Sequence, residues 1–230
     1  MSATSQLTFD DVYVSFARAR VLEGLSLTVG AGEIVGLAGR NGAGKTTTLR
    51  AVSGLVPLSM GSITLDGRPL PHSPEAVARR GVAHVPEGRG IFPDLTVDQN
   101  VRLGVLGKVG ETAAIRSTLE EKFPAIERLR GQRAGRLSGG EQQMLALVRG
   151  LVSHPKFLLV DEMSLGLSPR ALRTAIESLV TIGRSLDIGM LIVDQNSRML
   201  HEHCDRVYLL RDGKAEVWAD SSNIDSVYFE

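Results

Sequence analysis

The chain has 230 residues, 43% of them hydrophobic and 23% charged, and its 26 basic side chains balance 26 acidic ones. Such a composition is typical of one globular domain or two tightly joined lobes, and a chain of this length buries roughly 70–75% of its unfolded surface without a disulfide or metal staple. The single cysteine, Cys204, excludes an internal disulfide, and zero net charge argues against a protein that coats nucleic acid or an anionic membrane.

The first third of the chain predicts strands followed by the opening of an α/β unit. Leu7–Val14 and Leu22–Val29 are short and contain β-branched residues, as expected for a pair of antiparallel strands. Glu33–Ala38 is an apolar strand that ends at a glycine-rich turn, and Thr46–Ser53 has helical character. This order of strand, loop and helix is typical of an α/β protein.

The middle of the chain changes from strands to helices. Gly61–Gly67 alternates apolar and polar residues as a strand does, Pro74–Arg80 predicts a brief helix, and Val82–Val85 returns to strand. From Val97 to Val152 the pattern is helical, interrupted by prolines and glycines. We therefore expect a helical lobe inserted into a strand-containing core.

The last third predicts buried strands again. Phe157–Val160 and Met190–Val193 are each followed by a helical stretch, and Arg206–Asp220 predicts a hairpin with Asp212 and Gly213 at its turn. No run approaches the ~20 apolar residues that cross a bilayer, and no secretory signal precedes the first strand. The interpretation is one domain, with residues 1–86 and 156–230 forming the core and residues 87–155 the helical lobe. Any membrane spans are expected in separate subunits.

One complete motif predicts a nucleoside triphosphate site. Residues 39–46 read Gly-Arg-Asn-Gly-Ala-Gly-Lys-Thr, which fits G-x-x-x-x-G-K-[ST], and they lie between a strand and a helix as the motif requires. Glycines let successive N–H groups turn inward, and the following helix offers its positive end to bound phosphates. Lys45 is expected to reach the β- and γ-phosphates, and the Thr46 hydroxyl to contact Mg²⁺. We call residues 39–46 the phosphate loop.

The second half of such a site is expected at the end of a buried strand. The run Phe157–Val160 is followed by Asp161 and Glu162. Asp161 is expected to hold Mg²⁺ through water, and Glu162 to orient and polarise the water that attacks the γ-phosphate.

A third motif points to a family. Leu137–Gln143 reads Leu-Ser-Gly-Gly-Glu-Gln-Gln and precedes a helical run, about twenty residues before the acidic strand. With the phosphate loop and Asp161-Glu162, this signature segment resembles the ATP-binding cassette (ABC) family. The resemblance implies an α/β P-loop NTPase with a mixed-sheet core, an amino-terminal antiparallel β-subdomain and an inserted helical subdomain. It also implies that Ser138 and the glycine amides grip the ATP held by a second cassette.

The smaller motifs are placed by the same resemblance. Phe16 matches the aromatic residue that stacks on adenine, with a core phenylalanine as the alternative. By the same resemblance, the expected catalytic residues are Glu162, Lys45 and Gln195. The residues expected to contact Mg²⁺ are Thr46, Glu87 and Asp161. Contacts to ATP fall on Phe16, Gly39, Arg40, Asn41, Gly42, Ala43, Gly44, Lys45, Thr46, Thr47, Ser138, Gly139, Gly140 and Glu141.

The chain departs from the family pattern at two informative positions. Glu87 stands where a glutamine is usual; its carboxylate can contact Mg²⁺ but adds negative charge near the γ-phosphate. Gln195 stands where a histidine is usual, and an amide donates a hydrogen bond without carrying a proton. In the loop after Glu162, Met163 replaces the usual proline and Ser168 the frequent aspartate, which puts the coupling between two sites in doubt.

The segments around Glu87, Gln195 and Ser164–Pro169 are similar to the second ATP-binding subunit of high-affinity branched-chain amino-acid importers. The resemblance implies an ATPase on the cytoplasmic face of the membrane that pairs with a second ABC subunit, identical or different. It also implies that the ATPase binds transmembrane permease subunits, acts indirectly with a solute-binding protein and does not bind nucleic acid. Alternatives stay open: a mainly regulatory subunit of a heterodimer, a cassette for urea or related amides, or a soluble cassette in repair, translation or cluster assembly.

Overall fold

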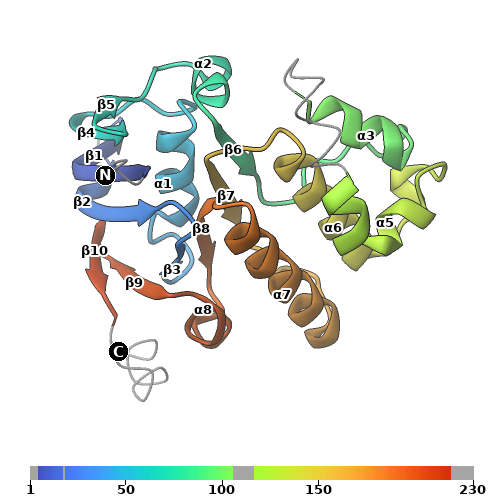
Figure 1. The fold of residues 1–230 in the computed structure, drawn as a ribbon. Helices are drawn as coiled ribbons and strands as arrows, with labels where there is room; N and C mark the ends of the chain where they lie inside the picture. Colours follow the sequence, from blue (N-terminus) through green and yellow to red (C-terminus); the bar gives the residue numbers. More distant parts are fainter. Residues whose placement is uncertain (1–4, 18, 106–116, 219–230) are drawn as a thin grey trace.

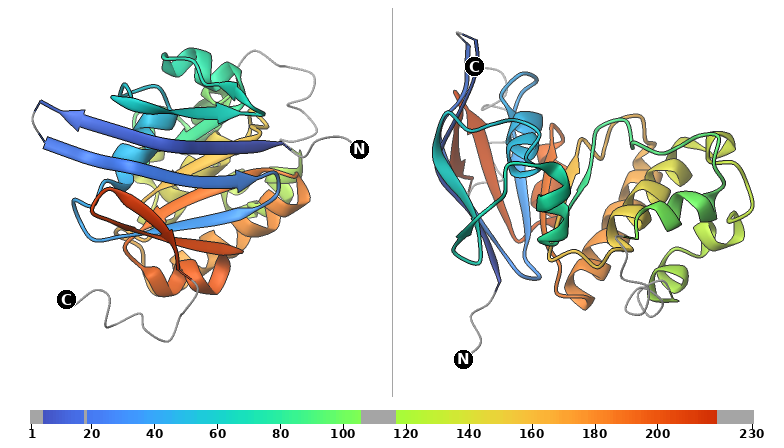
Figure 2. Two further views of the ribbon diagram at one scale, coloured as in Figure 1. Left: turned by 90° about the vertical axis from the view of Figure 1, so that its left-hand side faces the viewer. Right: turned by 90° about the horizontal axis from the view of Figure 1, so that it is seen from above.

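The computed structural model describes residues 5–17, 19–105 and 117–218. Two sheets stack against each other, and a group of helices lies beyond the larger one (Figure 1). Viewed from above, the larger sheet lies between the smaller sheet and these helices (Figure 2). The described part therefore has the α/β architecture predicted from the sequence.

The smaller sheet is antiparallel and has the order β2-β1-β4-β5. Its strands are β1 (Gln6–Phe16), β2 (Ala19–Gly30), β4 (Met60–Leu65) and β5 (Arg68–Pro69). The predicted strand pair is confirmed, but both strands are longer than the apolar pattern indicated, because pairing continues to Phe16 and Ala19 in a polar, exposed stretch. The two-residue strand β5 was too short to leave a hydrophobic pattern.

The larger sheet has the order β10-β9-β3-β8-β7-β6 and combines both ends of the chain. Its strands are β3 (Ile34–Ala38), β6 (Val82–Val85), β7 (Phe157–Asp161), β8 (Gly189–Asp194), β9 (Arg206–Arg211) and β10 (Lys214–Val217). Neighbouring strands from β9 to β6 are parallel, and β10 pairs antiparallel with β9 across the predicted turn at Asp212 and Gly213.

Both faces of this sheet are covered, which explains its continuous apolar strands. On one face, Leu191 of β8 packs in a cluster with Leu49 and Val52 of helix α1 (Lys45–Val52) and with residues of the antiparallel sheet. On the other face, Ile192 packs in a second cluster with residues of the helices α6 (Gly139–Leu151), α7 (Pro169–Ser185) and α8 (Ser197–His203). Successive residues of β8 thus serve different cores.

The remaining helices confirm the predicted helical middle. They are α2 (Pro74–Arg79), α3 (Val97–Leu103), α5 (Pro124–Arg128) and the 3₁₀ turn η1 (Ala134–Arg136), and residues 117–122 are also helical. Thr96 and Ser138 each form a capping box at the start of their helices, with Gln99 and Glu141 respectively. The division of the chain at residues 87 and 155 stays a prediction. Within the described ranges, no helix has the length and hydrophobicity needed to span a bilayer.

Candidate nucleotide-binding site

The parallel sheet brings four functional segments to one edge. Strand register aligns Ala38 of β3 with Asp194 of β8, and Asp161 of β7 with Val193. The phosphate loop follows β3, Glu162 follows β7, Gln195 follows β8, and the segment Pro86–Phe92, here called the Glu87 segment, follows β6. Ligands of open α/β sheets bind outside the carboxyl ends of the strands, so this edge is the expected place for a ligand.

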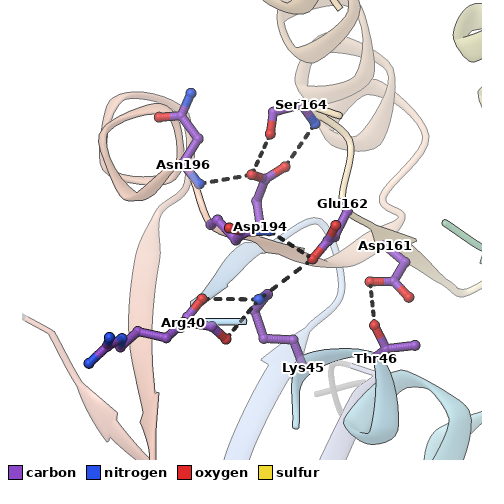
Figure 3. A network of polar contacts seen from close by, with 10 residues as sticks. Arg40, Lys45, Thr46, Asp161, Glu162, Ser164, Asp194 and Asn196 are labelled. Carbon is purple, nitrogen blue, oxygen red and sulfur yellow. Dashed lines mark hydrogen bonds and ion pairs between the residues drawn. The ribbon is translucent and has the colours of Figure 1, made fainter. Parts of the chain in front are cut away.

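Lys45 of the phosphate loop is almost fully buried, with 4% of its surface exposed. Its ammonium donates hydrogen bonds to the carbonyl oxygens of Gly39 and Arg40, at 3.0 and 3.2 Å, and lies 3.6 Å from Glu162 Oε1 (Figure 3). Gly44 directly before α1 has a φ of +107°, which a glycine adopts without strain. The loop thus presents a cation and a helix N-terminus at the same place.

Glu162 is held between two of the predicted catalytic residues. Gln195 Nε2 donates to Glu162 Oε1 at 3.2 Å, and Lys45 faces the same oxygen. The backbone of Glu162 has a φ of +43°, a strained conformation for a side-chain-bearing residue, and its N–H donates to Val193 O. A carboxylate fixed in this way could accept a proton from a water molecule beside a bound phosphate.

Thr46 and Asp161 form the candidate magnesium position. Thr46 Oγ1 donates to Asp161 Oδ1 at 3.3 Å. Burial raises the pKa of Asp161 from 3.8 to about 6, and the carboxylates of Glu162 and Glu87 act in the same direction. In the described part of the chain, no group of three or more His, Cys, Asp or Glu residues could hold a metal alone. Hydroxyl and carboxylate oxygens nevertheless suit Mg²⁺, which usually completes its shell with phosphates and waters.

Asp194 is a site residue that the sequence interpretation missed. It is 1% exposed and accepts hydrogen bonds from Ser164 Oγ (2.6 Å), Ser164 N (2.8 Å) and Asn196 N (2.8 Å), as Figure 3 shows. It therefore ties the loop after Glu162 to the residues on either side of Gln195. A carboxylate at the end of a buried strand, as at Asp161, was the signal that could have identified it.

The signature segment lies at the start of α6. Ser138 is the N-cap, and Glu141 accepts hydrogen bonds from Ser138 N and Oγ at 2.8 and 2.7 Å. The amides of Gly139 and Gly140 belong to the first helical turn, which has no acceptors for them within the helix. This turn could therefore bind an anion.

Phe16 ends β1 beside Ala19, and it is 48% exposed. The alternative that it is a core phenylalanine is therefore wrong. The nearby residue Val21 lies against the phosphate loop, because a Cβ added to Gly44 would come within 3.2 Å of Val21 Cγ1. An exposed ring next to this strand could stack on a base.

A cleft of about 570 Å³ opens between the core and α6. It reaches from Thr46 and Asp161 to the Glu87 segment, and the exposed side chains of Leu55 and Leu103 are among its lining. Figure 1 shows the core and the helical part on either side of β6. A segment of another protein that docks in this cleft would therefore lie next to the candidate magnesium position.

His84 of β6 also lines the cleft. Its Nδ1 lies 2.9 Å from Ser53 Oγ, which itself donates to Leu49 O. The two side chains share this hydrogen bond, and the buried Nε2 has no hydrogen-bond partner among the described residues. Burial lowers the pKa of His84 from 6.5 to about 4, and nearby Arg50 acts in the same direction.

We expect His84 to make the fold sensitive to acid. Between pH 6.5 and 4 the unfolded chain binds a proton here that the native protein does not, so the free energy of unfolding falls as the pH falls. Between pH 7 and pH 5 the loss is about 2 kcal/mol. His84→Gln should remove that difference in urea unfolding, and His72→Gln, at an exposed histidine, should not. An unchanged pH dependence in His84→Gln would contradict the assignment.

Comparison with known sequences finds one family model and close relatives. The model described as ABC transporter matches residues 22–164. The high-affinity branched-chain amino acid transport ATP-binding protein BraG of Pseudomonas aeruginosa is 38% identical over 210 residues, which cover 90% of both chains. The lipopolysaccharide export system ATP-binding protein LptB of Escherichia coli is also 38% identical, over 213 residues that cover 90% of this chain and 87% of LptB.

Solved structures agree with these matches. The structure described as the ATP binding subunit of an ABC transporter has a TM-score of 0.81 and 27% identity, covering 96% of this chain and 92% of that one. An ATP-binding cassette of an ABC transporter in its ADP conformation has a TM-score of 0.84, covering 98% and 95%. At 19% identity, this second likeness concerns the fold alone.

Proposed function

This chain belongs to the ABC transporter family, and we propose that it hydrolyses ATP to power an importer of branched-chain amino acids. Membership of the family makes it an ATP-binding ATPase subunit of a transporter. The observation that carries the proposed chemistry is the meeting of Lys45, Thr46, Asp161, Glu162 and Gln195 at one sheet edge.

In the proposed reaction the phosphate loop binds the triphosphate, and Lys45 leaves its carbonyl partners to contact the β- and γ-phosphates. Thr46 and Asp161, with Glu87 nearby, would hold Mg²⁺, which neutralises charge on the phosphates. Glu162 then accepts a proton from the attacking water, and Gln195 keeps this carboxylate oriented through the bond to Oε1.

A second cassette is needed to complete the site. In the proposed pairing, the first turn of α6, which Ser138 caps, serves the phosphate loop of the partner cassette rather than that of its own chain. We propose that Ser138, Gly139 and Gly140 contact the ATP of a partner cassette, and that Glu141 fixes Ser138 through the capping box. Closing and reopening of this pair would drive transport.

The cleft is the proposed docking place of the permease. Its exposed residues Leu55 and Leu103 offer apolar area to a membrane subunit, and its floor is continuous with Asp161 and Glu87. A movement of the docked permease segment would therefore reach the nucleotide site directly. With a permease docked there, the proposed location of the chain is the cytoplasmic face of the membrane.

Branched-chain amino acids are proposed as the cargo because of the identity with BraG. In cells that lack this chain, uptake of radiolabelled leucine should fall at least about tenfold. The wild-type chain should restore it, whereas Glu162→Gln should not.

Lipopolysaccharide export is the second candidate, because LptB is equally identical to this chain. Its test uses the same cells, in which surface lipopolysaccharide is measured beside leucine uptake. Normal uptake with depleted surface lipopolysaccharide would overturn the import proposal. Loss of leucine uptake with intact surface lipopolysaccharide would support it.

A further inference from the structure

Two arginines connect the Glu87 segment to α6, one from each side. Arg89 of the segment donates from Nη1 to Gln142 Oε1 at 2.6 Å. Arg149 of the helix donates from Nη1 to Gly90 O at 2.7 Å, and its guanidinium lies 5.4 Å from the ring centre of Phe92. Gln142 and Arg149 are seven residues apart and therefore share one face of the helix. We call this pair of contacts the arginine clamp.

The Arg89 contact extends to the signature segment. Gln142 Nε2 donates to Leu137 O at 3.2 Å and to Ala134 O at 3.3 Å. Leu137 immediately precedes Ser138, the N-cap of α6. A guanidinium that holds the oxygen of the Gln142 amide also fixes the direction of its NH₂ group, so Arg89 acts on the residue next to Ser138.

Arg89 also lies against two glycines, one in the signature segment and one in the loop after Glu162. A Cβ added to Gly139 would meet Arg89 Nη2 at 3.2 Å, and one added to Gly166 would meet it at 3.6 Å. Gly139 starts α6, and Gly166 belongs to the Ser164 loop, Ser164–Pro169, which Asp194 anchors. The guanidinium thus lies where these two segments approach each other.

The backbone of Arg89 supports a specific role. Its φ is +69°, and the neighbouring Gly88 and Gly90 have φ values of +74° and +58°. Glycines adopt this left-handed conformation readily, but for Arg89, which has a side chain, it is energetically costly. Such backbone strain persists where the surrounding contacts hold the residue in place. The hydrogen bond to Gln142 is one contact that holds it.

We infer that Arg89 is a positioning residue that fixes the first turn of α6 relative to the Glu87 segment and the Ser164 loop. The inference rests on the proposed pairing of two cassettes. In that pair, Arg89 sets the hydrolysis rate at the site that this turn completes. It transmits the position of the Glu87 segment through Gln142 and Leu137 to Ser138, and it does not contact the reacting atoms.

The test compares Arg89→Ala, Arg89→Lys and Gln142→Ala in the transporter complex purified with its permease. Loss of one charge-assisted hydrogen bond should lower ATP turnover about fivefold to tenfold in Arg89→Ala. ATP binding by the free chain should stay within about twofold, because the phosphate loop is untouched. Arg89→Lys keeps one cationic donor and should retain at least about half of the turnover.

The matched control is Arg128→Ala, at an exposed arginine of α5, and its turnover should equal that of wild type.

A double variant separates positioning from simple stability. Arg89→Ala with Gln142→Ala should be no slower than the slower single variant, because both remove the same contact. Additive losses, wild-type turnover in Arg89→Ala, or a loss that matches a lower thermal midpoint would overturn the inference. Glu162→Gln is measured in parallel: if it keeps wild-type turnover, the proposed function fails. If it is inactive while Arg89→Ala is normal, only the role of Arg89 fails.

Discussion

Replacing Glu162 by glutamine should lower the rate of ATP hydrolysis by about 10²–10⁴-fold while ATP binding stays within about threefold. Glutamine has the same shape and keeps an oxygen for the bond from Gln195, but it cannot accept the proton of the attacking water. Lys45, which holds the phosphates in the proposed reaction, is unchanged. The substitution therefore separates chemistry from binding.

The measurement is phosphate release in the assembled complex, with nucleotide affinity measured in parallel. Glu202→Gln, at an exposed glutamate of α8, is the matched control and should hydrolyse ATP at the wild-type rate. Unchanged hydrolysis in Glu162→Gln would mean that the hydrolysis comes from another subunit. The chain would then be a regulatory subunit. That role is compatible with Glu87 and Gln195, which stand where the family usually has a glutamine and a histidine.

Lys45→Ala should weaken ATP binding by at least about 100-fold. The lysine ammonium is buried beside the phosphate loop, bonded to two carbonyl oxygens and close to Glu162, and in the proposed reaction it exchanges the carbonyl oxygens for phosphate oxygens. Two charge-assisted hydrogen bonds to phosphates contribute about 1.5–3 kcal/mol each. Without the cation, the carboxylate of Glu162 also lies unopposed beside the γ-phosphate, which adds repulsion.

Isothermal titration with a non-hydrolysable ATP analogue measures this loss. Lys122→Ala removes an exposed lysine that pairs with Glu121, and it should leave the affinity unchanged. The stability of the variant is measured as well, because Lys45 also contacts Gly39 O, Arg40 O and Glu162 in the native protein, and its loss could destabilise the fold. An affinity within threefold of wild type in a folded Lys45→Ala variant would contradict the assigned phosphate site.

Much of the fold could be predicted because β3, β7 and β8 are buried throughout and β4 alternates between buried and more exposed residues. Phe157–Val160 is apolar throughout because α1 and α6 cover both faces of β7, and Gly61–Gly67 alternates because it lies in a sheet packed on one side. The phosphate loop and Asp161-Glu162 were predictable for a related reason: the loop directly follows β3, Asp161 ends β7, and parallel strands bring their carboxyl ends together.

The sequence could not predict contacts that join distant segments through single side chains. The hydrogen bond from Arg89 to Gln142 spans 53 residues, and the one from Ser164 to Asp194 spans 30. Neither pair has a spacing within one helix or strand, so no local periodicity indicates it. The hydrogen bonds of Lys45 to Gly39 O and Arg40 O depend on the conformation of the phosphate loop, so the sequence pattern did not predict them either.

The central claim is that this chain binds ATP at its phosphate loop and completes a second cassette's site with Ser138. The most direct measurement is the molar mass of Glu162→Gln in light scattering, with the other cassette added if the complex contains a different one. With Mg²⁺ and ATP the mass should rise from the 24.7 kDa of one chain to that of a cassette pair, and Lys45→Ala or Ser138→Arg should abolish the rise. A mass of one cassette at saturating ATP would contradict the account.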